Sequence, residues 1–252
     1  SFDMNRDGTI STAETKVSVL PLGQPGRVDY DYNYLSYSTG VNYRVAEHLA
    51  VFGRYSRGGR ASADKILFTP AVNYNTGKLV DDESAYDTVK QAELGLKYRI
   101  SGLTFNVTGF SAKTGERNTQ IVSGADGQAQ VLNIVRGYEA KGVELEAAVR
   151  KGPFSVTAGA TYTDAKITSD AQRPELVGNK PRHQADFIYS VTPQVELKYV
   201  TFGANVIGTT SSFAQDTNQL KLPGYKLVNA FVQVRPAERV QLMLNVNNLF
   251  NQ

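Results

Sequence analysis

The sequence of 252 residues predicts an all-β fold, and more narrowly the wall of an antiparallel transmembrane β-barrel. Three observations support this: a two-residue apolar period from about residue 33 onward, unusually long strands, and connections that alternate between short and long. No stretch sustains a comparable 3.6-residue apolar period, so helices are not expected. Abundant Tyr, Phe, Gly, Asn, Thr and Ser also favour strands and turns.

The two-residue period is clearest where charged and aliphatic residues alternate without interruption. In the segment 142–150, Val143, Leu145 and Val149 share one face, whereas Glu144 and Glu146 share the other. This is the pattern of a strand with one apolar and one polar face. The clearest examples are ELGLKYRI (93–100), GVELEAAVR (142–150), FSVTAGATY (154–162) and VQLMLNVN (240–247).

Ten strands are expected, and their connections alternate in length. Short and long connections placed at opposite ends of a sheet are typical of outer-membrane barrels, which have tight periplasmic turns and longer extracellular loops. The strands are expected at 33–44, 49–57, 88–100, 103–113, 132–150, 154–167, 181–192, 195–208, 223–235 and 239–250. The short connections are 45–48, 101–102, 151–153, 192–194 and 236–238, and the long ones are 58–87, 114–131, 168–180 and 209–222.

Strand length favours a membrane wall over a soluble sheet. The expected strands have about 10 to 18 residues, whereas strands of soluble proteins mostly have about 5–6 residues and a tilted lipid-spanning strand needs about 9–11. The apolar face would then contact lipid and the charged face a water-filled lumen. The alternative is a large soluble β-protein that exposes the same charges to solvent. The charged residues expected to face the lumen are Glu93, Lys97, Glu144, Glu146, Asp186 and Lys198.

Aromatic residues recur near the ends of the expected strands, as in the aromatic belts at bilayer interfaces. Phe154, Tyr162, Tyr199 and Phe250 are examples. The tyrosines Tyr30, Tyr32, Tyr34 and Tyr37 fit either such a belt or a surface on which a ligand stacks. The belt is the favoured interpretation.

Composition excludes several other classes of protein. There is no cysteine, the two histidines are far apart in sequence, and the net charge is only +3, so thiolate metal sites, histidine triads and nucleic-acid binding are not expected. No catalytic motif such as GxSxG or HExxH is present, so an enzyme is not expected either. No window of 18 apolar residues and no signal peptide are found, which indicates a cleaved leader or an internal piece of a longer protein.

The segment DMNRDGTISTAE (3–14) matches every fixed position of the EF-hand calcium-loop pattern. Its expected Ca²⁺ ligands are Asp3, Asn5, Asp7, Thr9, Ser11 and Glu14. Residues 15–32 contain two prolines and predict no exiting helix, so the expected site orders an extracellular loop with weak affinity, roughly 10⁻⁴–10⁻³ M. The alternative is a loop tip whose carboxylates bond to its own backbone.

Five segments, in order, resemble the C-terminal half of a TonB-dependent outer-membrane receptor. They are residues 37–62, 89–116, 137–167, 178–193 and 224–252, of which the GVELE hairpin and the terminal NVNNLF are the most specific. The resemblance implies a 22-stranded barrel with an N-terminal plug and a short TonB box, neither of which is visible. The expected organisation is therefore an extracellular loop with the calcium motif at 1–32 and a partial barrel at 33–252, holding about ten of the 22 strands.

The resemblance further implies ligand-gated, TonB-dependent active transport across the bacterial outer membrane. The expected cargo is a scarce nutrient such as a ferric siderophore, cobalamin or a glycan, and the expected partners are outer-membrane lipid and the TonB energy-coupling protein. The ligand-binding residues stay unknown. Two alternatives remain open: a calcium-dependent binding or adhesion module on a soluble β-sheet, and a non-gated, porin-like barrel.

Overall fold

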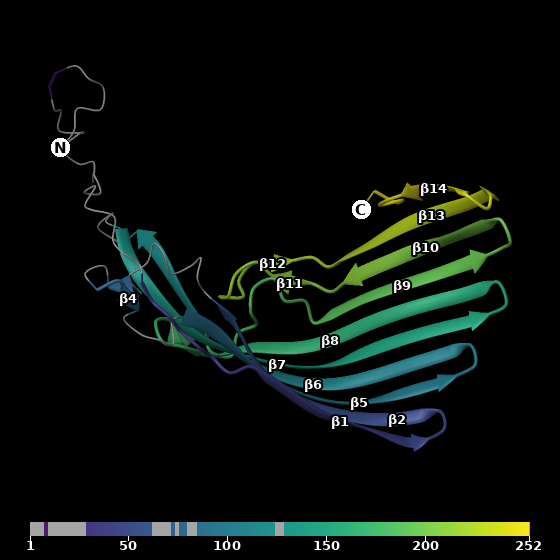
Figure 1. Cartoon of the computed structure of the whole chain (residues 1–252). Coiled ribbons are helices and arrows are strands. Elements are labelled where there is room, and N and C mark those ends of the chain that lie inside the picture. The colour runs from purple at the N-terminus through teal and green to yellow at the C-terminus, as the bar shows by residue number, and fades with distance from the viewer. Residues whose placement is uncertain are drawn as a thin grey trace.

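The computed structural model describes residues 8–9, 29–61, 72–73, 76–79, 85–123 and 129–251, with backbone alone for 118–123 and 129–134. Ten strands form one antiparallel sheet in which each strand pairs with its neighbours along the chain (Figure 1). This confirms the predicted fold class and the ten predicted strands. The strands are β1 (Tyr37–Ala46), β2 (Leu49–Ala61), β5 (Tyr86–Ile100), β6 (Leu103–Ser123), β7 (Ala129–Lys151), β8 (Phe154–Asp170), β9 (Phe187–Glu196), β10 (Val200–Thr209), β13 (Tyr225–Ala237) and β14 (Val240–Val246).

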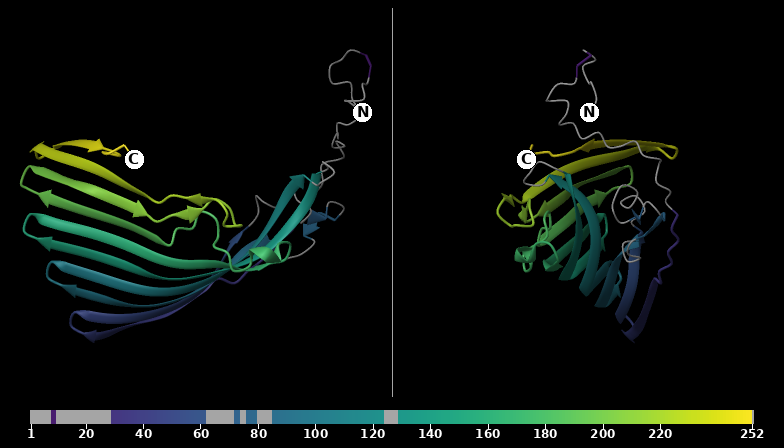
Figure 2. Two further views of the ribbon diagram at one scale, coloured as in Figure 1. Left: turned by 180° about the vertical axis from the view of Figure 1, so that it is seen from behind. Right: turned by 90° about the vertical axis from the view of Figure 1, so that its left-hand side faces the viewer.

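The connections separate by length to the two ends of the sheet. Tight turns lie at one end and long connections at the other, as Figures 1 and 2 show from three directions. The long connections carry two small ribbons, β3 (Val72–Asn73) with β4 (Lys78–Leu79) and β11 (Ser212–Phe213) with β12 (Lys221–Leu222), and a 3₁₀ turn, η3 (Pro174–Leu176). The sheet curves but stays open, since β1 and β14 each pair with a single strand. We call the two ends the turn end and the loop end.

The predicted turn at 192–194 is wrong, because β9 continues to Glu196 and the turn lies at 197–199. Pro193 is inside β9, opposite Val156 of β8. The β9–β10 register runs to Gln194 and resumes at Val191, so it skips the proline, which has no N–H to donate to β10. Lys198 consequently lies in the turn over the Tyr199 ring, and not on a lumen-facing strand.

Asp186 is the other residue for which the predicted position on a strand is wrong. It precedes β9, and its carboxylate accepts a hydrogen bond from Lys180 Nζ at 2.6 Å. The chain from 178 to 186 belongs to the long connection because its main chain pairs with the far end of β8 and not with β10. Thr163 N, for example, donates to Asp186 O at 2.8 Å.

The predicted loop at 114–131 is mostly strand. β6 and β7 extend as a hairpin until Ser123 faces Ala129. The sequence analysis missed this extension because the polar sequence TGERNTQIVS (114–123) lacks the alternation of apolar and polar residues that located the other strands. Main-chain pairing with β7 is what defines this extension.

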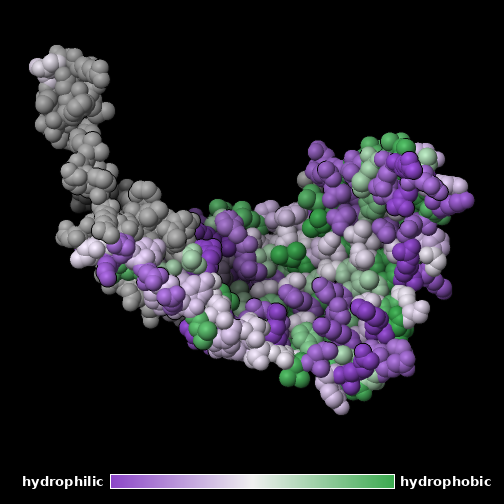
Figure 3. All heavy atoms as spheres, viewed as in Figure 1, coloured by the Kyte–Doolittle hydropathy of each residue, from purple (hydrophilic) through white to green (hydrophobic). Residues whose placement is uncertain are grey.

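The described part of the sheet has almost no interior of its own. A soluble antiparallel sheet covers one face with a core. Here one face, the apolar face, stays uncovered: Leu94 is 71% exposed and Leu244 is 65% exposed. Figure 3 shows hydrophobic side chains reaching the surface among hydrophilic ones. In the part of the chain that the structure describes, the buried apolar residues are only Val72, Ala85, Ala165, Ile167, Leu176 and Ala185.

The opposite face, the polar face, is lined by hydrogen-bonded charged and amide groups. Arg54 Nη2 lies 2.7 Å from Glu93 Oε1, and Asn106 Nδ2 donates to Glu146 Oε2 at 3.1 Å. Lys97 and Glu144 follow the same alternation, so four of the six predicted lumen residues lie on this face. No helix among the described residues is long and apolar enough to cross a membrane.

Aromatic rings on the polar face lie over glycines of the neighbouring strand, which makes those glycines sensitive to substitution. A Cβ added at Gly142 would collide with the Tyr162 carbonyl and would lie 2.5 Å from Phe110 Cζ, whereas one added at Gly109 meets nothing closer than 3.8 Å. We expect Gly142→Ala to destabilise the folded protein by about 1–3 kcal/mol, because overpacking forces the backbone to move. Gly109→Ala is the control, and urea unfolding in lipid vesicles compares the two. Equal losses would contradict the packing argument.

Candidate functional site at the loop end of the sheet

Two long connections fold over the loop end of β8. Ile167 N donates to Asn179 O at 2.9 Å, and Gly178 N donates to Ile167 O at 2.9 Å. The segment 178–186 therefore continues the sheet past the point where β9 begins. Beneath this connection, Ile167 is 0% exposed and Leu176 of η3 is 1% exposed. These two side chains form a small core at the rim of the wall.

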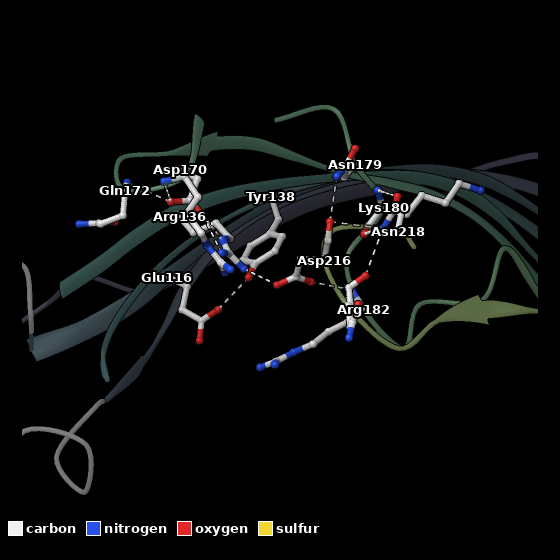
Figure 4. A network of polar contacts seen from close by, with 12 residues as sticks. Glu116, Arg136, Tyr138, Asp170, Gln172, Asn179, Lys180, Arg182, Asp216 and Asn218 are labelled. Carbon is white, nitrogen blue, oxygen red and sulfur yellow. Dashed lines mark hydrogen bonds and ion pairs between the residues drawn. The ribbon is translucent and has the colours of Figure 1, made fainter. Parts of the chain in front are cut away.

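A buried ion network ties both connections to the wall (Figure 4). Arg136 of β7 donates from Nε to Asp170 Oδ2 at 2.7 Å and from Nη1 to Asp216 Oδ2 at 2.6 Å. Its side chain is 6% exposed, and those of Asp170 and Asp216 are 1% and 10% exposed. Asp170 ends β8 and Asp216 lies between β11 and β12, so one guanidinium joins three segments far apart in the sequence.

The local electrostatics keep Arg136 and Asp170 ionised. Burial alone would lower the pKa of Arg136, but its hydrogen bonds to Tyr138, Asp170 and Asp216 outweigh burial and raise the pKa above its ordinary value. Burial would likewise raise the pKa of Asp170, yet the N–H groups of Arg173 and Gln172 and the Arg136 guanidinium hold it below the ordinary range. Arg136 and Asp170 are therefore charged at neutral pH.

Asp216 and its neighbour Asn218 connect the two loops directly. Arg182 N donates to Asp216 Oδ1 at 2.9 Å, and Asn179 Nδ2 donates to the Asp216 carbonyl at 2.9 Å. Asn218 both accepts from Lys180 N and donates to Lys180 O, at 2.9 and 2.8 Å. One guanidinium holds two carboxylates, and main-chain N–H groups of Arg173 and Arg182 donate to the same aspartates, so the network fixes the shape of the rim. The residues of this network position the two loops and do not form a reactive centre.

Tyrosines gather at the loop ends of β2 and β5. The rings of Tyr32 and Tyr34 stack on Tyr86 with centroid separations of 5.1 and 5.0 Å, and Tyr34 Oη donates to Gly59 O at 3.2 Å. Tyr37 instead lies 6.2 Å from Tyr55. The predicted set of four tyrosines thus divides, and Tyr86, which the sequence analysis did not include with them, is the centre of the cluster.

The predicted calcium loop is described only at Gly8 and Thr9. Thr9 is exposed, and Gly8 has φ +87°, the left-handed conformation that the sharp turn of such a loop requires at this position. The other predicted ligands, Asp3, Asn5, Asp7, Ser11 and Glu14, lie outside the described residues. Within the described residues, no group of three or more His, Cys, Asp or Glu side chains could hold a metal ion.

The sequence analysis missed the Arg136 network. Its members are separated by 34 and 80 positions, and no local pattern distinguishes Asp170 or Asp216 from other loop aspartates. The one available signal was that each of two successive long connections was predicted to contain an aspartate. Loop aspartates are too common for this signal alone to indicate pairing.

Comparison with known proteins identifies a family and a fold. A family model described as TonB-dependent receptor-like β-barrel matches residues 6–249. No curated protein matches the chain. Similar solved structures include the siderophore receptor PiuA (18% identity, TM-score 0.64, 88% of this chain covered) and the ferric preacinetobactin receptor BauA (16%, 0.67, 86%), both from Acinetobacter baumannii. The ferric yersiniabactin uptake receptor FyuA from Yersinia pestis is also similar (17%, 0.64, 85%). The chain spans 32% of the length of each of these three structures.

Proposed function

The chain belongs to the TonB-dependent receptor-like β-barrel family, and from that premise we propose that it forms part of the wall of an outer-membrane receptor for active nutrient uptake. The family consists of transport receptors and not of enzymes. The observation that carries the proposal is the two-faced sheet, whose uncovered apolar face suits lipid and whose polar face suits a water-filled passage. In this proposal the loop end faces the cell exterior and the turn end faces the periplasm.

The proposed cargo is a ferric chelate. The three structures compared above are named for a siderophore, ferric preacinetobactin and ferric yersiniabactin. The similarity to these structures is a similarity of fold. The cargo class is therefore proposed by analogy, and a direct assay must test it. The fixed rim supports the proposal physically: loops held by a buried ion network present a pre-shaped mouth, which lowers the entropic cost of binding.

Transport is tested by uptake in iron-starved cells that express the protein. We expect accumulation of at least one radiolabelled ferric siderophore of the catecholate, hydroxamate or carboxylate class. Uptake should stop when a proton ionophore collapses the energy source on which TonB depends. Cells without the gene provide the background. Uptake that continues without energy would favour the porin-like alternative, and recovery of the protein in the soluble fraction would exclude a membrane wall altogether.

We also propose that residues 1–32 form an extracellular loop that Ca²⁺ orders through Asp3, Asn5, Asp7, Thr9, Ser11 and Glu14. The left-handed Gly8 supports this, since its φ of +87° matches the turn at the sixth loop position. Calcium at about 1–10 mM should slow tryptic cleavage after Arg6 and Lys16, because the expected affinity is roughly 10⁻⁴–10⁻³ M. Glu14→Gln, which removes one carboxylate oxygen, should abolish the protection. Equal protection by magnesium, or none by calcium, would contradict the site.

A further inference from the structure

At the turn end of the sheet, the polar face carries three cations that the strand register brings together. Lys97 and Arg99 stand two residues apart on β5, and Arg44 of β1 lies across β2 from Lys97, with Ala50 as the Cα partner of both. We call Arg44, Lys97 and Arg99 the cation triplet. Residues two apart on a strand share a face about 7 Å apart, and two strand spacings span about 10 Å. Side chains as long as those of Arg and Lys can therefore reach one ligand above Ala50.

The small residue beneath the triplet leaves a groove in the wall. Ala50 stands between the long side chains of Arg44 and Lys97, so the surface is low at this point. The groove has a volume of about 780 Å³, within the about 300–1,000 Å³ typical of small-molecule sites. It is lined by the triplet and by neutral polar residues, among them Asn42 and Thr104. The wall thus presents several hydrogen-bond donors around a space that suits a small ligand.

The charges of the triplet are not neutralised by the part of the chain that the structure describes. All three residues are exposed, and none of them forms an ion pair with another described residue. The acids beside the groove are Glu146, which accepts a hydrogen bond from Asn106 at 3.1 Å, and Glu47, whose side chain is 87% exposed and lies 3.9 Å from His48. The groove therefore keeps an unbalanced positive charge.

The way in which Lys97 is held preserves its charge for a ligand. Farther along the same face, Arg54 is paired with Glu93 at 2.7 Å, so its charge is already matched. Lys97 is held by a ring and not by an acid, because its Nζ lies 4.7 Å from the centroid of Phe52. A cation–π contact positions an ammonium group without neutralising it. The wall thus fixes Lys97 in place and leaves it able to bind an anion.

From this geometry we propose that the cation triplet is an exit subsite that binds the carboxylate or catecholate oxygens of an anionic ferric chelate. A cleft lined by charges of one sign concentrates counter-ions, and both Arg and Lys bind oxyanions through charge-assisted hydrogen bonds. The inference rests on the proposed function, which makes the lumen a path for a ferric chelate and places the turn end at its periplasmic exit. It adds that the cargo is negatively charged.

The test follows acetylation of Lys97 in the full-length receptor, purified in neutral detergent, with a small uncharged reagent and mass spectrometry that resolves each lysine. An anion bound in the groove should cover Nζ and slow the reaction there. Three probes are compared at one ionic strength: a ferric tris-catecholate, a ferric tris-hydroxamate and inorganic phosphate. Each catecholate carries two negative charges and each hydroxamate one, so the first complex is a trianion and the second is neutral. Lys151 and Lys198, exposed at the turn end outside the groove, are internal controls.

We expect the ferric tris-catecholate to slow acetylation of Lys97 and to leave Lys151 and Lys198 unchanged. The variant Arg44→Gln, Arg99→Gln keeps Lys97 as the reporter. It should need at least roughly tenfold more chelate for the same protection, because a hydrogen bond to a charged group contributes about this factor. The matched control Lys151→Gln, Arg239→Gln removes two exposed turn-end cations outside the groove and should be protected as the parent is.

Equal protection by the neutral tris-hydroxamate, or equal loss of protection in both variants, would overturn the proposal. Protection by inorganic phosphate at the concentration at which the chelate protects would overturn the assignment to the cargo. A Lys97 that stays unacetylated without any probe would show that another part of the receptor fills the groove, which would also overturn the proposal. Labelling needs no transport, so intact protection without energy-dependent uptake would contradict the proposed function and leave the anion site standing.

Discussion

Leu145→Lys in β7 will destabilise the folded barrel by about 1–3 kcal/mol, because it places a charge on the lipid face inside the apolar band, between its middle and its outer edge. Glu144→Lys, one residue earlier, will change the stability by less than about 1 kcal/mol because its side chain faces the water-filled side. The two residues are neighbours in one strand, and the alternation of side chains sends them to opposite faces. Leu145 is 41% exposed in the open sheet, with lipid as its expected partner.

The measurement is urea unfolding in lipid vesicles, followed by heat-modifiable migration on gels. The pair of variants separates a membrane wall from a soluble sheet, since a soluble sheet would tolerate an added lysine at an exposed leucine. Similar stability in Leu145→Lys and Glu144→Lys would therefore contradict the lipid-facing assignment of the apolar face.

Arg136→Gln will release the two long connections at the rim. Removing the guanidinium leaves Asp170 and Asp216 buried without a counter-charge, and breaking such a pair costs about 3–5 kcal/mol. Because the network joins loops to the wall, the loss should appear there and leave the transmembrane strands folded. Trypsin should cleave after Arg182 and Lys221 much faster than in the parent protein, and amide exchange should rise over 171–186 and 211–224.

The matched control for this variant is Arg150→Gln. Arg150 Nη2 lies 2.6 Å from Glu196 Oε2, but the two side chains are 60% and 41% exposed. Exposed pairs contribute about 0–1 kcal/mol, so this substitution should leave the rim unchanged. Equal cleavage rates in Arg136→Gln and Arg150→Gln would show that the buried network does not hold the loops.

The same network predicts a pH dependence. The pKa of Asp170 is lower in the folded protein than in the unfolded chain, so its contribution to stability is fully present above the ordinary value of about 3.9. That contribution is lost as the pH falls through the folded-state pKa. Tryptic fragments after brief acid exposure should therefore stay those of the intact rim at pH 5 and change only below about pH 4. Release of the loops already at pH 5–6 would contradict the assignment to Asp170.

Particular strands show how much of the fold could be predicted from the sequence alone. Alternation of apolar and charged residues, as in ELGLKYRI and GVELEAAVR, located the transmembrane strands and separated their two faces, because neighbouring residues of a strand necessarily point to opposite sides. The alternation rule failed at two places in the chain. Pro193 suggested a turn although it lies inside β9, and the sequence of the β6 extension to Ser123 has no apolar pattern.

The sequence by itself determined the all-β wall, its ten strands, the ends at which short and long connections lie, and the family that these features resemble. All of these depend on local chemistry repeated along the chain. Only the tertiary structure decided the rim and the cation triplet. Arg136 meets Asp216 across 80 positions, and Arg44 and Lys97 come to lie on either side of Ala50 only once two strand registers are known. A one-residue slip in any register would send that strand's side chain to the other face, so such sites arise from pairing and not from local pattern.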